Sequence, residues 1–339
     1  INSNPVEIRR VAKPGSGLAD IVETATYDGS ACLNYLKTCD KPLTVTDAKG
    51  IVTDYTWDPN SGNILTETRA APTAGATRPQ KRYSYVQAYA WYKNSGGTLV
   101  QSPYPVWLVS QVSECRTGAA PTCIGTADET RTTYSYGTSG TANNLLPVSV
   151  TAAGDGSISE TTTFTHDSLG NKLTEDGPLA GSADTTRWRY DAMRRVVGVI
   201  TPDPDGGGPM KFRATRNTYD AAGRLVKVEV GTVNSQSDAD WALFVPIQTV
   251  ETAYDQLDRK TREWTYGTTG GTQQLTQFSY DLAGNLECTA VRMNPAAYGS
   301  LPASACTLGT QGPDGPDRIT KLTYDAAGQL IKTTVAYGT

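Results

Sequence analysis

"YDAAGRLVKVEV", residues 219–230, returns almost unaltered as "YDLAGNLECTAV" at 280–291 and as "YDAAGQLIKTTV" at 324–335. The short Asp side chain can accept a backbone N–H two residues further on and so begin a turn. The Gly three residues after the Asp fits a backbone position with positive φ, as in hairpin loops built on a type I turn. Residues on both sides of the turn alternate in character, which is typical of strands. Each copy therefore predicts the turn of a β-hairpin.

Weaker copies of this pattern occur along much of the chain. Seven copies can be aligned, and they begin at Trp57, His166, Tyr190, Tyr219, Tyr254, Tyr280 and Tyr324, with "TDAKGIVT" from Thr46 as a further half-copy. From Tyr190 onward the steps between copies are 29, 35, 26 and 44 residues. Arg194 and Asp258 stand where the Gly is expected, so either the turn changes there or its neighbours hold it at a cost.

The recurring residues are interpreted as structural, because an active site occurs once whereas a turn residue occurs at every turn. The predicted structural turn residues are Tyr190, Asp191, Tyr219, Asp220, Gly223, Tyr254, Asp255, Tyr280, Asp281, Gly284, Tyr324, Asp325 and Gly328.

The composition is typical of an all-β protein whose sheet faces are partly exposed to solvent. Only 38% of the 339 residues are hydrophobic, and Tyr (18) far outnumbers Phe (4). Segments 82–92 and 106–114 also read as strands, while 237–245 reads as a short helical insertion. A net charge of −4 without a basic run argues against nucleic-acid binding, and no apolar run is long enough for a membrane span.

The motif divides the chain into three predicted regions. Residues 1–43 match it poorly, 44–163 form a divergent β region with long insertions, and 164–339 carry well-formed repeats. Both ends of the sequence are expected to be cuts in a longer protein.

The six cysteines are grouped in sequence as Cys32 with Cys39, Cys115 with Cys123, and Cys288 with Cys306. Six cysteines allow 15 pairings, and the sequence does not select one. We expect local pairing, which implies an oxidising compartment. Free thiols and a metal site are the alternatives, although a chain with one His and no C-x-x-C is a poor zinc binder.

These repeats resemble the YD-repeat, or RHS-repeat, family, whose hallmark Tyr-Asp-x-x-Gly-Arg/Asn-Leu stands at 219–225 and 280–286 and, with Gln before the Leu, at 324–330. The resemblance covers 44–69 and 164–339 well and the rest weakly. It implies hairpins paired edge to edge in a long twisted or spiralling sheet, part of a shell or an extended scaffold. Known relatives are bacterial RHS toxins, cocoon subunits of toxin complexes and teneurins. The acidic self-cleaving segment and the toxin domain that follow the repeats in the bacterial relatives are not found here.

Candidates for chemistry are few. His166, the single His, fills the Tyr position of a repeat beside Asp167, and we interpret it as a substituted Tyr rather than a catalytic base. "DPDGGG" (203–208) and "GPDGPD" (312–317) lack the closing Glu of a calcium loop. Tyr- and Trp-rich strands before the Gly-rich loops 137–144 and 267–274 make sugars the best ligand hypothesis.

The sequence thus predicts a non-enzymatic structural segment of a large secreted or surface-exposed bacterial protein, with no cofactor or metal. The expected partners are neighbouring repeats of the parent chain or of other copies, together with an enclosed toxin domain or surface glycans. An adhesive module for glycans or proteins and a self-associating extracellular fibre subunit are the alternatives.

Overall fold

The computed structural model describes residues 4–29, 37–115, 123–154, 158–181, 183–268 and 271–338. These residues form 21 β-strands, one short α-helix and one turn of 3-10 helix. The chain divides into two compact units, Ile1–Pro178 and Leu179–Thr339. The predicted all-β class of repeated antiparallel hairpins is confirmed. The region boundaries predicted after residues 43 and 163 rest on how closely the sequence matches the motif, and they stay predictions.

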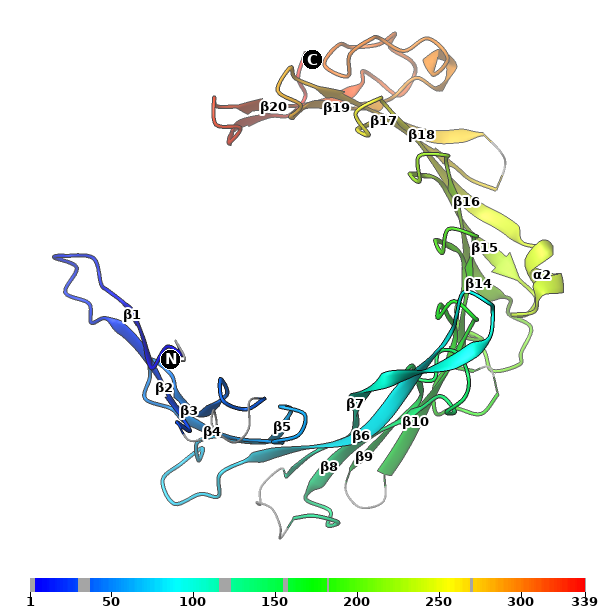
Figure 1. Ribbon diagram of the computed structural model, residues 1–339. Coiled ribbons are helices and arrows are strands. Elements are labelled where there is room, and N and C mark those ends of the chain that lie inside the picture. Colours follow the sequence, from blue (N-terminus) through cyan, green and yellow to red (C-terminus); the bar gives the residue numbers. More distant parts are fainter. Residues whose placement is uncertain are drawn as a thin grey trace. The chain divides into compact units, whose positions relative to one another are not determined.

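The first unit is an antiparallel meander in which each strand pairs with the next one along the chain (Figure 1). Its strands are β1 (Glu7–Arg10), β2 (Ile21–Tyr27), β3 (Pro42–Thr46), β4 (Val52–Trp57), β5 (Ile64–Thr68), β6 (Gln80–Lys93), β7 (Leu99–Cys115), β8 (Glu129–Tyr136), β9 (Pro147–Gly154), β10 (Ile158–His166) and β11 (Lys172–Asp176).

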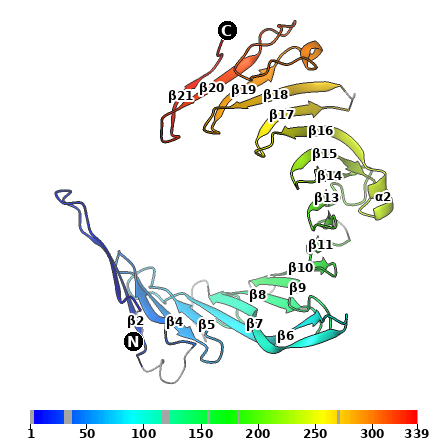
Figure 2. The same cartoon turned by 45° about the horizontal axis from the view of Figure 1, so that its top comes forward.

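The second unit repeats this topology, as Figure 2 shows for the strands coloured green to red. Its elements are β12 (Thr186–Tyr190), β13 (Val196–Ile200), β14 (Phe212–Tyr219), β15 (Leu225–Val233), α2 (Asp238–Ala242), β16 (Val245–Tyr254), β17 (Lys260–Tyr266), β18 (Thr272–Tyr280), β19 (Leu286–Arg292), η1 (Pro295–Ala297), β20 (Arg318–Tyr324) and β21 (Leu330–Thr334). Helix α2 confirms the predicted helical insertion.

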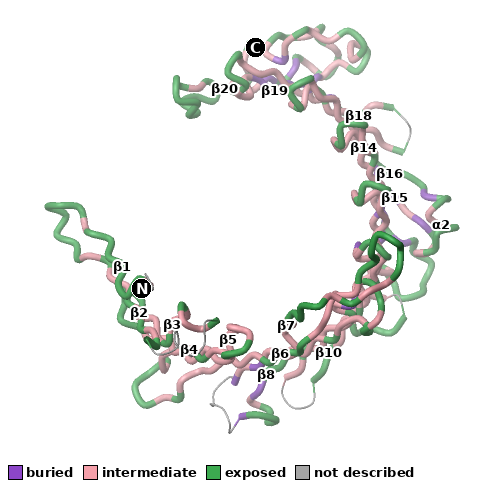
Figure 3. Tube along the Cα trace, in the orientation of Figure 1, coloured by how far each residue is buried: buried purple, intermediate pink, exposed green. Residues whose placement is uncertain are grey.

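Most strand residues are half-buried, because each meander is a single layer with solvent on much of both faces (Figure 3). Neighbouring strands are therefore joined by polar side chains as well as by the backbone. Paired threonine hydroxyls lie 2.6 Å apart in Thr26–Thr44 and Thr165–Thr174, and such cross-strand pairs stabilise a sheet.

Fully apolar packing occurs where a connection folds back over the sheet of the second unit. Under α2, Ile200, Phe212, Ala214, Val233 and Phe244 form a core cluster against Trp241. A second cluster lies under the connection 293–317, where Cys288, Ala290, Ala305 and Ile319 are buried. Each cluster thus depends on one long connection rather than on a second layer.

Candidate functional site

The Asp of the repeated motif holds its turn by hydrogen bonds in both directions. At Asp220, the N–H of Gly223 donates to the Asp carbonyl at 3.0 Å, and the N–H of Arg224 donates to the carboxylate at 2.9 Å. The N–H of Asp220 in turn donates to the carbonyl of Arg224 at 3.0 Å. The same pattern holds at the following turns: Asp167, Asp191, Asp255, Asp281 and Asp325.

The residue three after the Asp has positive φ in every one of these turns. The φ of Gly223, Gly284 and Gly328 is 87°, 88° and 77°. Arg194 and Asp258, which replace Gly, keep the same geometry with φ of 65° and 60°. Of the two outcomes left open by the sequence, the turn therefore stays the same and its neighbours hold the side chain in a left-handed conformation.

Further turns of this kind occur outside the full copies of the motif. In the half-copy, Gly50 has φ of 78° and its N–H donates to the carbonyl of Asp47. Asn94 replaces Asp in the turn between β6 and β7, where Gly97 has φ of 79°. The Asn94 turn escaped the sequence analysis, although Asn offers the same acceptor oxygen as Asp.

The motif tyrosines tie each hairpin to the preceding one. The hydroxyl of Tyr254 donates to the carbonyl of Leu225 at 3.0 Å, and that of Tyr280 donates to the carbonyl of Lys260 at 2.9 Å. In each case the acceptor is the first residue of the strand that follows the previous Asp turn. Tyr219 and Tyr324 make the equivalent bonds to Val196 and Leu286.

The same aromatic position recurs in hairpins that lack the Asp. The hydroxyl of Tyr85 donates to the carbonyl of Ile64 and that of Tyr136 to the carbonyl of Val109. A one-residue shift in strand register marks this position in both units, at Tyr27, Trp57, Tyr85, Tyr136, His166, Tyr190, Tyr219, Tyr254, Tyr280 and Tyr324. The aromatic position of the repeat therefore also occurs at Tyr85 and Tyr136, in a part of the chain where the sequence resemblance is weak.

The residue four after the Asp is the one functional position of the motif that sequence reasoning missed. The guanidinium of Arg224 donates to the Asp220 carboxylate at 2.7 Å and to the carbonyl of Asp255, in the next turn, at 3.0 Å. Its guanidinium also lies over the Tyr254 ring, 5.2 Å from the centroid. Arg195 and Arg259 lie in the same way 4.5 Å from the rings of Tyr219 and Tyr280. This contact of one turn with the next, the Arg interlock, joins successive hairpins at one rim.

Electrostatics follow from these contacts. The pKa of Asp220 is lowered, chiefly by the backbone N–H of Arg224 and then by its side chain. The backbone N–H groups of Arg195 and Arg259 likewise lower the pKa of Asp191 and Asp255. These carboxylates are ionised and engaged within their own turns at neutral pH, which makes them poor general acids or bases.

His166 occupies the aromatic position of its hairpin, at the register shift between β10 and β11. Burial lowers its pKa, Lys172 lowers it further, and Asp167 acts in the opposite direction. The imidazole is therefore neutral at pH 7. The Asp167 carboxylate accepts the backbone N–H groups of Leu169 and Asn171, so its place is that of a turn residue.

Two of the three expected cysteine pairs lie within the described residues. Disulfides join Cys115 to Cys123 and Cys288 to Cys306, with Cα atoms 5.9 and 5.2 Å apart. Cys32 lies outside the described residues, so its pairing with Cys39 stays a prediction. The one cluster of potential metal ligands within the described residues is Cys115, Cys123 and Asp128, and its two sulfur atoms belong to a disulfide.

The connection 293–317 is anchored by a buried ion pair. The guanidinium of Arg292 donates to the Asp317 carboxylate at 2.6 Å, and their side chains are 2% and 4% exposed. Arg292 also donates to Gln277 and to the carbonyls of Ser304 and Thr307. Burial by itself would raise the pKa of Asp317, but the N–H groups of Met293 and Gly309 and the guanidinium outweigh it, so the pKa is lowered. Asp317, considered above as part of a calcium-like stretch, thus belongs to a clamp.

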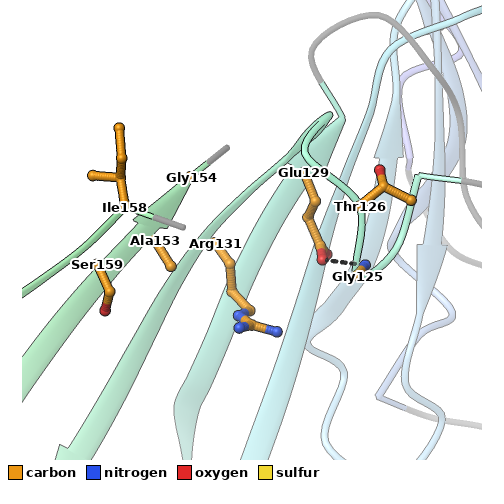
Figure 4. Close-up of a pocket in the computed structure, with 8 residues that line it drawn as sticks. All are labelled: Gly125, Thr126, Glu129, Arg131, Ala153, Gly154, Ile158 and Ser159. Atoms are coloured by element: carbon orange, nitrogen blue, oxygen red, sulfur yellow. Dashed lines mark hydrogen bonds between the residues drawn. The ribbon is translucent and has the colours of Figure 1, made fainter. Parts of the chain in front are cut away.

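A shallow cavity of about 220 Å³ lies beside the ends of β8, β9 and β10 (Figure 4). Its charged residues are Glu129 and Arg131, and one Glu129 oxygen accepts the N–H of Gly125 at 2.8 Å. The other oxygen accepts a hydrogen bond from Arg82 at 2.9 Å. Both carboxylate oxygens therefore have structural partners, and the residues that line this cavity offer no pair of nucleophile and base.

No helix among the described residues has the length and apolar character needed to cross a membrane.

No protein-family model matches this sequence, and no curated protein matches it. Solved structures do show similarity. A structure of TcdB2-TccC3 without its hypervariable C-terminal region is 13% identical over 97% of this chain and 19% of that chain, with a TM-score of 0.38. For TcdB2-TccC3-Cdc42 the values are 12% identity, 96% and 21% coverage, and a TM-score of 0.34. The Tc holotoxin pore of Photorhabdus luminescens is 14% identical over 96% of this chain and 21% of that chain, with a TM-score of 0.33. This chain thus spans about a fifth of the length of each of these chains.

Proposed function

We propose that the chain is a non-enzymatic scaffold, a segment of a large secreted or surface-exposed bacterial protein. The observation that carries the proposal is the recurrence of one set of contacts at successive hairpins. Three contacts occur together at Asp191, Asp220 and Asp255: the hydrogen-bonded Asp turn, the hydrogen bond from the tyrosine hydroxyl of the next hairpin, and the Arg interlock. A catalytic centre would need one position that differs from the others.

The edges of such a scaffold are where partners would be expected. Strand β21 pairs with β20 on one side, and its Leu330 and Ile331 side chains are 53% and 63% exposed. An unpaired strand edge with apolar side chains can accept another strand. We therefore propose further hairpins, of the parent chain or of another copy, as partners at this edge.

The disulfides support a location outside the reducing cytosol, because such bonds persist mainly in oxidising compartments. Intact-mass analysis under non-reducing conditions tests this part of the proposal. Protein purified from its native source should carry disulfides at Cys115–Cys123 and Cys288–Cys306. Free thiols at all four positions would instead indicate a scaffold that is assembled inside the cell.

Pulling single molecules from both ends with optical tweezers tests the scaffold itself. A sheet built from hairpins that mainly contact their neighbours should unravel in steps, since each repeat is a separate unit of stability. The 35-residue step from Tyr219 to Tyr254 would release about 12 nm of chain. One rupture of the whole described chain, as expected of a compact enzyme domain, would overturn the proposal.

A further inference from the structure

A second cavity, of about 390 Å³, lies between residues 86–89 of β6, Leu108 and Ser110 of β7, and Tyr134 and Tyr136 of β8. One side of it is formed by Gln87 and Tyr89 of β6, and the other by Tyr134 and Tyr136 of β8. Ser139 and Asn144 of the connection that follows β8 also line it. The remaining lining residues are Val86, Ala88, Leu108, Ser110 and Gly137. The volume falls within the roughly 300–1,000 Å³ that is typical of small-molecule sites.

The wall contributed by residues 137–146 is held in place before any ligand binds. Asn144 is 5% exposed; its amide donates to the carbonyl of Tyr89 at 2.8 Å, and its oxygen accepts the N–H of Trp91 at 3.1 Å. A Cβ atom at Gly137 would lie 2.8 Å from the Asn144 Cα, so this close approach requires glycine. Because the wall is preorganised, a ligand would bind with little ordering cost.

The lining combines aromatic, aliphatic and polar side chains and is uncharged. Tyr89, Tyr134 and Tyr136 supply rings, while Gln87, Ser139 and Asn144 belong to residue types with amide or hydroxyl groups. No charged side chain lines the cavity among the described residues. A pyranose ring presents an apolar C–H face that packs on an aromatic ring, and its rim of hydroxyls exchanges hydrogen bonds with amides and hydroxyls. We propose that this cavity binds a neutral saccharide.

The equivalent position after β17 shows a different character. The cavity there, of about 480 Å³, is also bordered by a tyrosine and a glycine, Tyr266 and Gly267, but its lining includes Lys227, Glu229 and Glu251. Burying these charges against a neutral sugar would carry a desolvation cost. The charged cavity beside Tyr266 therefore serves as a control for the uncharged cavity beside Tyr134.

The proposal is tested by screening the full chain against an array of neutral and acidic glycans, followed by calorimetry with the best neutral oligosaccharide. Selective binding of a neutral glycan is expected, with affinity at least tenfold weaker in Gln87→Ala and in Tyr134→Ala. The matched control is Ile247→Ala, an exposed residue of the charged cavity, and its affinity should equal that of the unchanged protein.

Gln87 is exposed and Tyr134 half-buried, and circular dichroism checks that both variants keep the sheet. Absence of binding to every neutral glycan, binding restricted to acidic glycans, or equal affinity in folded Gln87→Ala and Tyr134→Ala would each overturn the assignment. The scaffold proposal is judged independently by the pulling experiment, so the two can fail separately.

Discussion

Strand β19 is held in two different ways at its two ends. It begins after the Asp281 turn, an exposed loop whose contacts recur in its neighbours with small variations. It ends at Arg292, where a buried ion pair and the Cys288–Cys306 disulfide anchor the connection 293–317. The first unit has a similar combination at the end of β7 and the start of β8, where the Arg82–Glu129 ion pair lies beside the Cys115–Cys123 disulfide. The turns gain stability by repetition along the sheet, whereas this connection depends on two strong contacts, the ion pair and the disulfide.

This contrast determines how damage should spread. A lost turn contact affects one hairpin and its neighbour, since the other turns remain. A lost clamp contact leaves a charge buried without its partner, which is among the most destabilising changes available to a protein. Five predictions test the contrast, beginning with the largest expected effect.

Arg292→Met should release the connection 293–317. It leaves the Asp317 carboxylate buried without its ion-pair partner, for which a local loss of about 3–5 kcal/mol is expected. Hydrogen exchange of the amides in this connection should accelerate by roughly two to four orders of magnitude while the Asp220 turn is unaffected. The control is Arg262→Met, an exposed residue on β17, which is separated from β19 by β18; equal acceleration in both variants would contradict the clamp.

Replacing Cys288 and Cys306 together by Ser should weaken the same connection. The disulfide closes a loop of 18 residues, which corresponds to about 3 kcal/mol in the chain-entropy model. Limited proteolysis should cut within 293–317 faster than in the unchanged protein. Similar cleavage of the two proteins would show that the ion pair alone holds the connection.

Asp220→Ala should loosen its own turn and, more weakly, the next one. The turn loses the acceptor for the Arg224 N–H, and the Arg224 guanidinium loses its nearest anchor before it reaches Asp255. Hydrogen exchange near 220–226 should accelerate by less than that of the connection 293–317 in Arg292→Met. The matched variant is Asp281→Ala, whose partner Asn285 donates to the Asp281 carboxylate but has no guanidinium of the kind that Arg224 extends to the Asp255 carbonyl. There the increase in the following turn should be smaller.

Acid should weaken the turns only well below neutral pH. The pKa values of Asp191, Asp220 and Asp255 are lowered in the folded protein. Their contribution to folding stability is therefore complete above the ordinary Asp pKa of about 3.9. It is lost as the pH falls through the lower pKa values of the folded protein. Carboxyl titration by NMR should give midpoints below the ordinary value; midpoints at or above it would contradict the hydrogen bonds described.

Arg194→Gly should stabilise its turn slightly. Arg194 has φ of 65°, and removal of its Cβ relieves a strain of about 1 kcal/mol, partly offset by the greater freedom of Gly in the unfolded chain. The converse change, Gly223→Ala with φ of 87°, should destabilise by a similar amount. Thermal unfolding of both variants checks whether the signs are opposite.

Much of this architecture could be predicted from local residue patterns. Asp220 and Gly223 reveal a turn because their roles are fulfilled within five residues of chain. The role of Arg224 was missed because its second partner, Asp255, belongs to the next hairpin. A single copy of the motif does not show how close the next turn lies in space. Tyr85 and Tyr136 were missed because no Asp follows them, although their place in the sheet is the same.

The clamp and the cavity were harder to predict for a different reason. Arg292 and Asp317 are 25 residues apart and occur in no repeated pattern, so only the folded connection brings them together. The Gly-rich loop 137–144 was singled out as a sugar-binding candidate, but its partner wall on β6 came from the structure.

In an antiparallel meander the links between strands alternate between two rims. In the second unit one rim carries five-residue Asp turns of constant form, while the links at the other rim range from 5 residues between β17 and β18 to 25 between β19 and β20. Evolution can therefore exchange whole segments at one rim without disturbing the contacts that hold the array together at the other. For the protein engineer, the 201–211 link is a natural place to graft a foreign peptide.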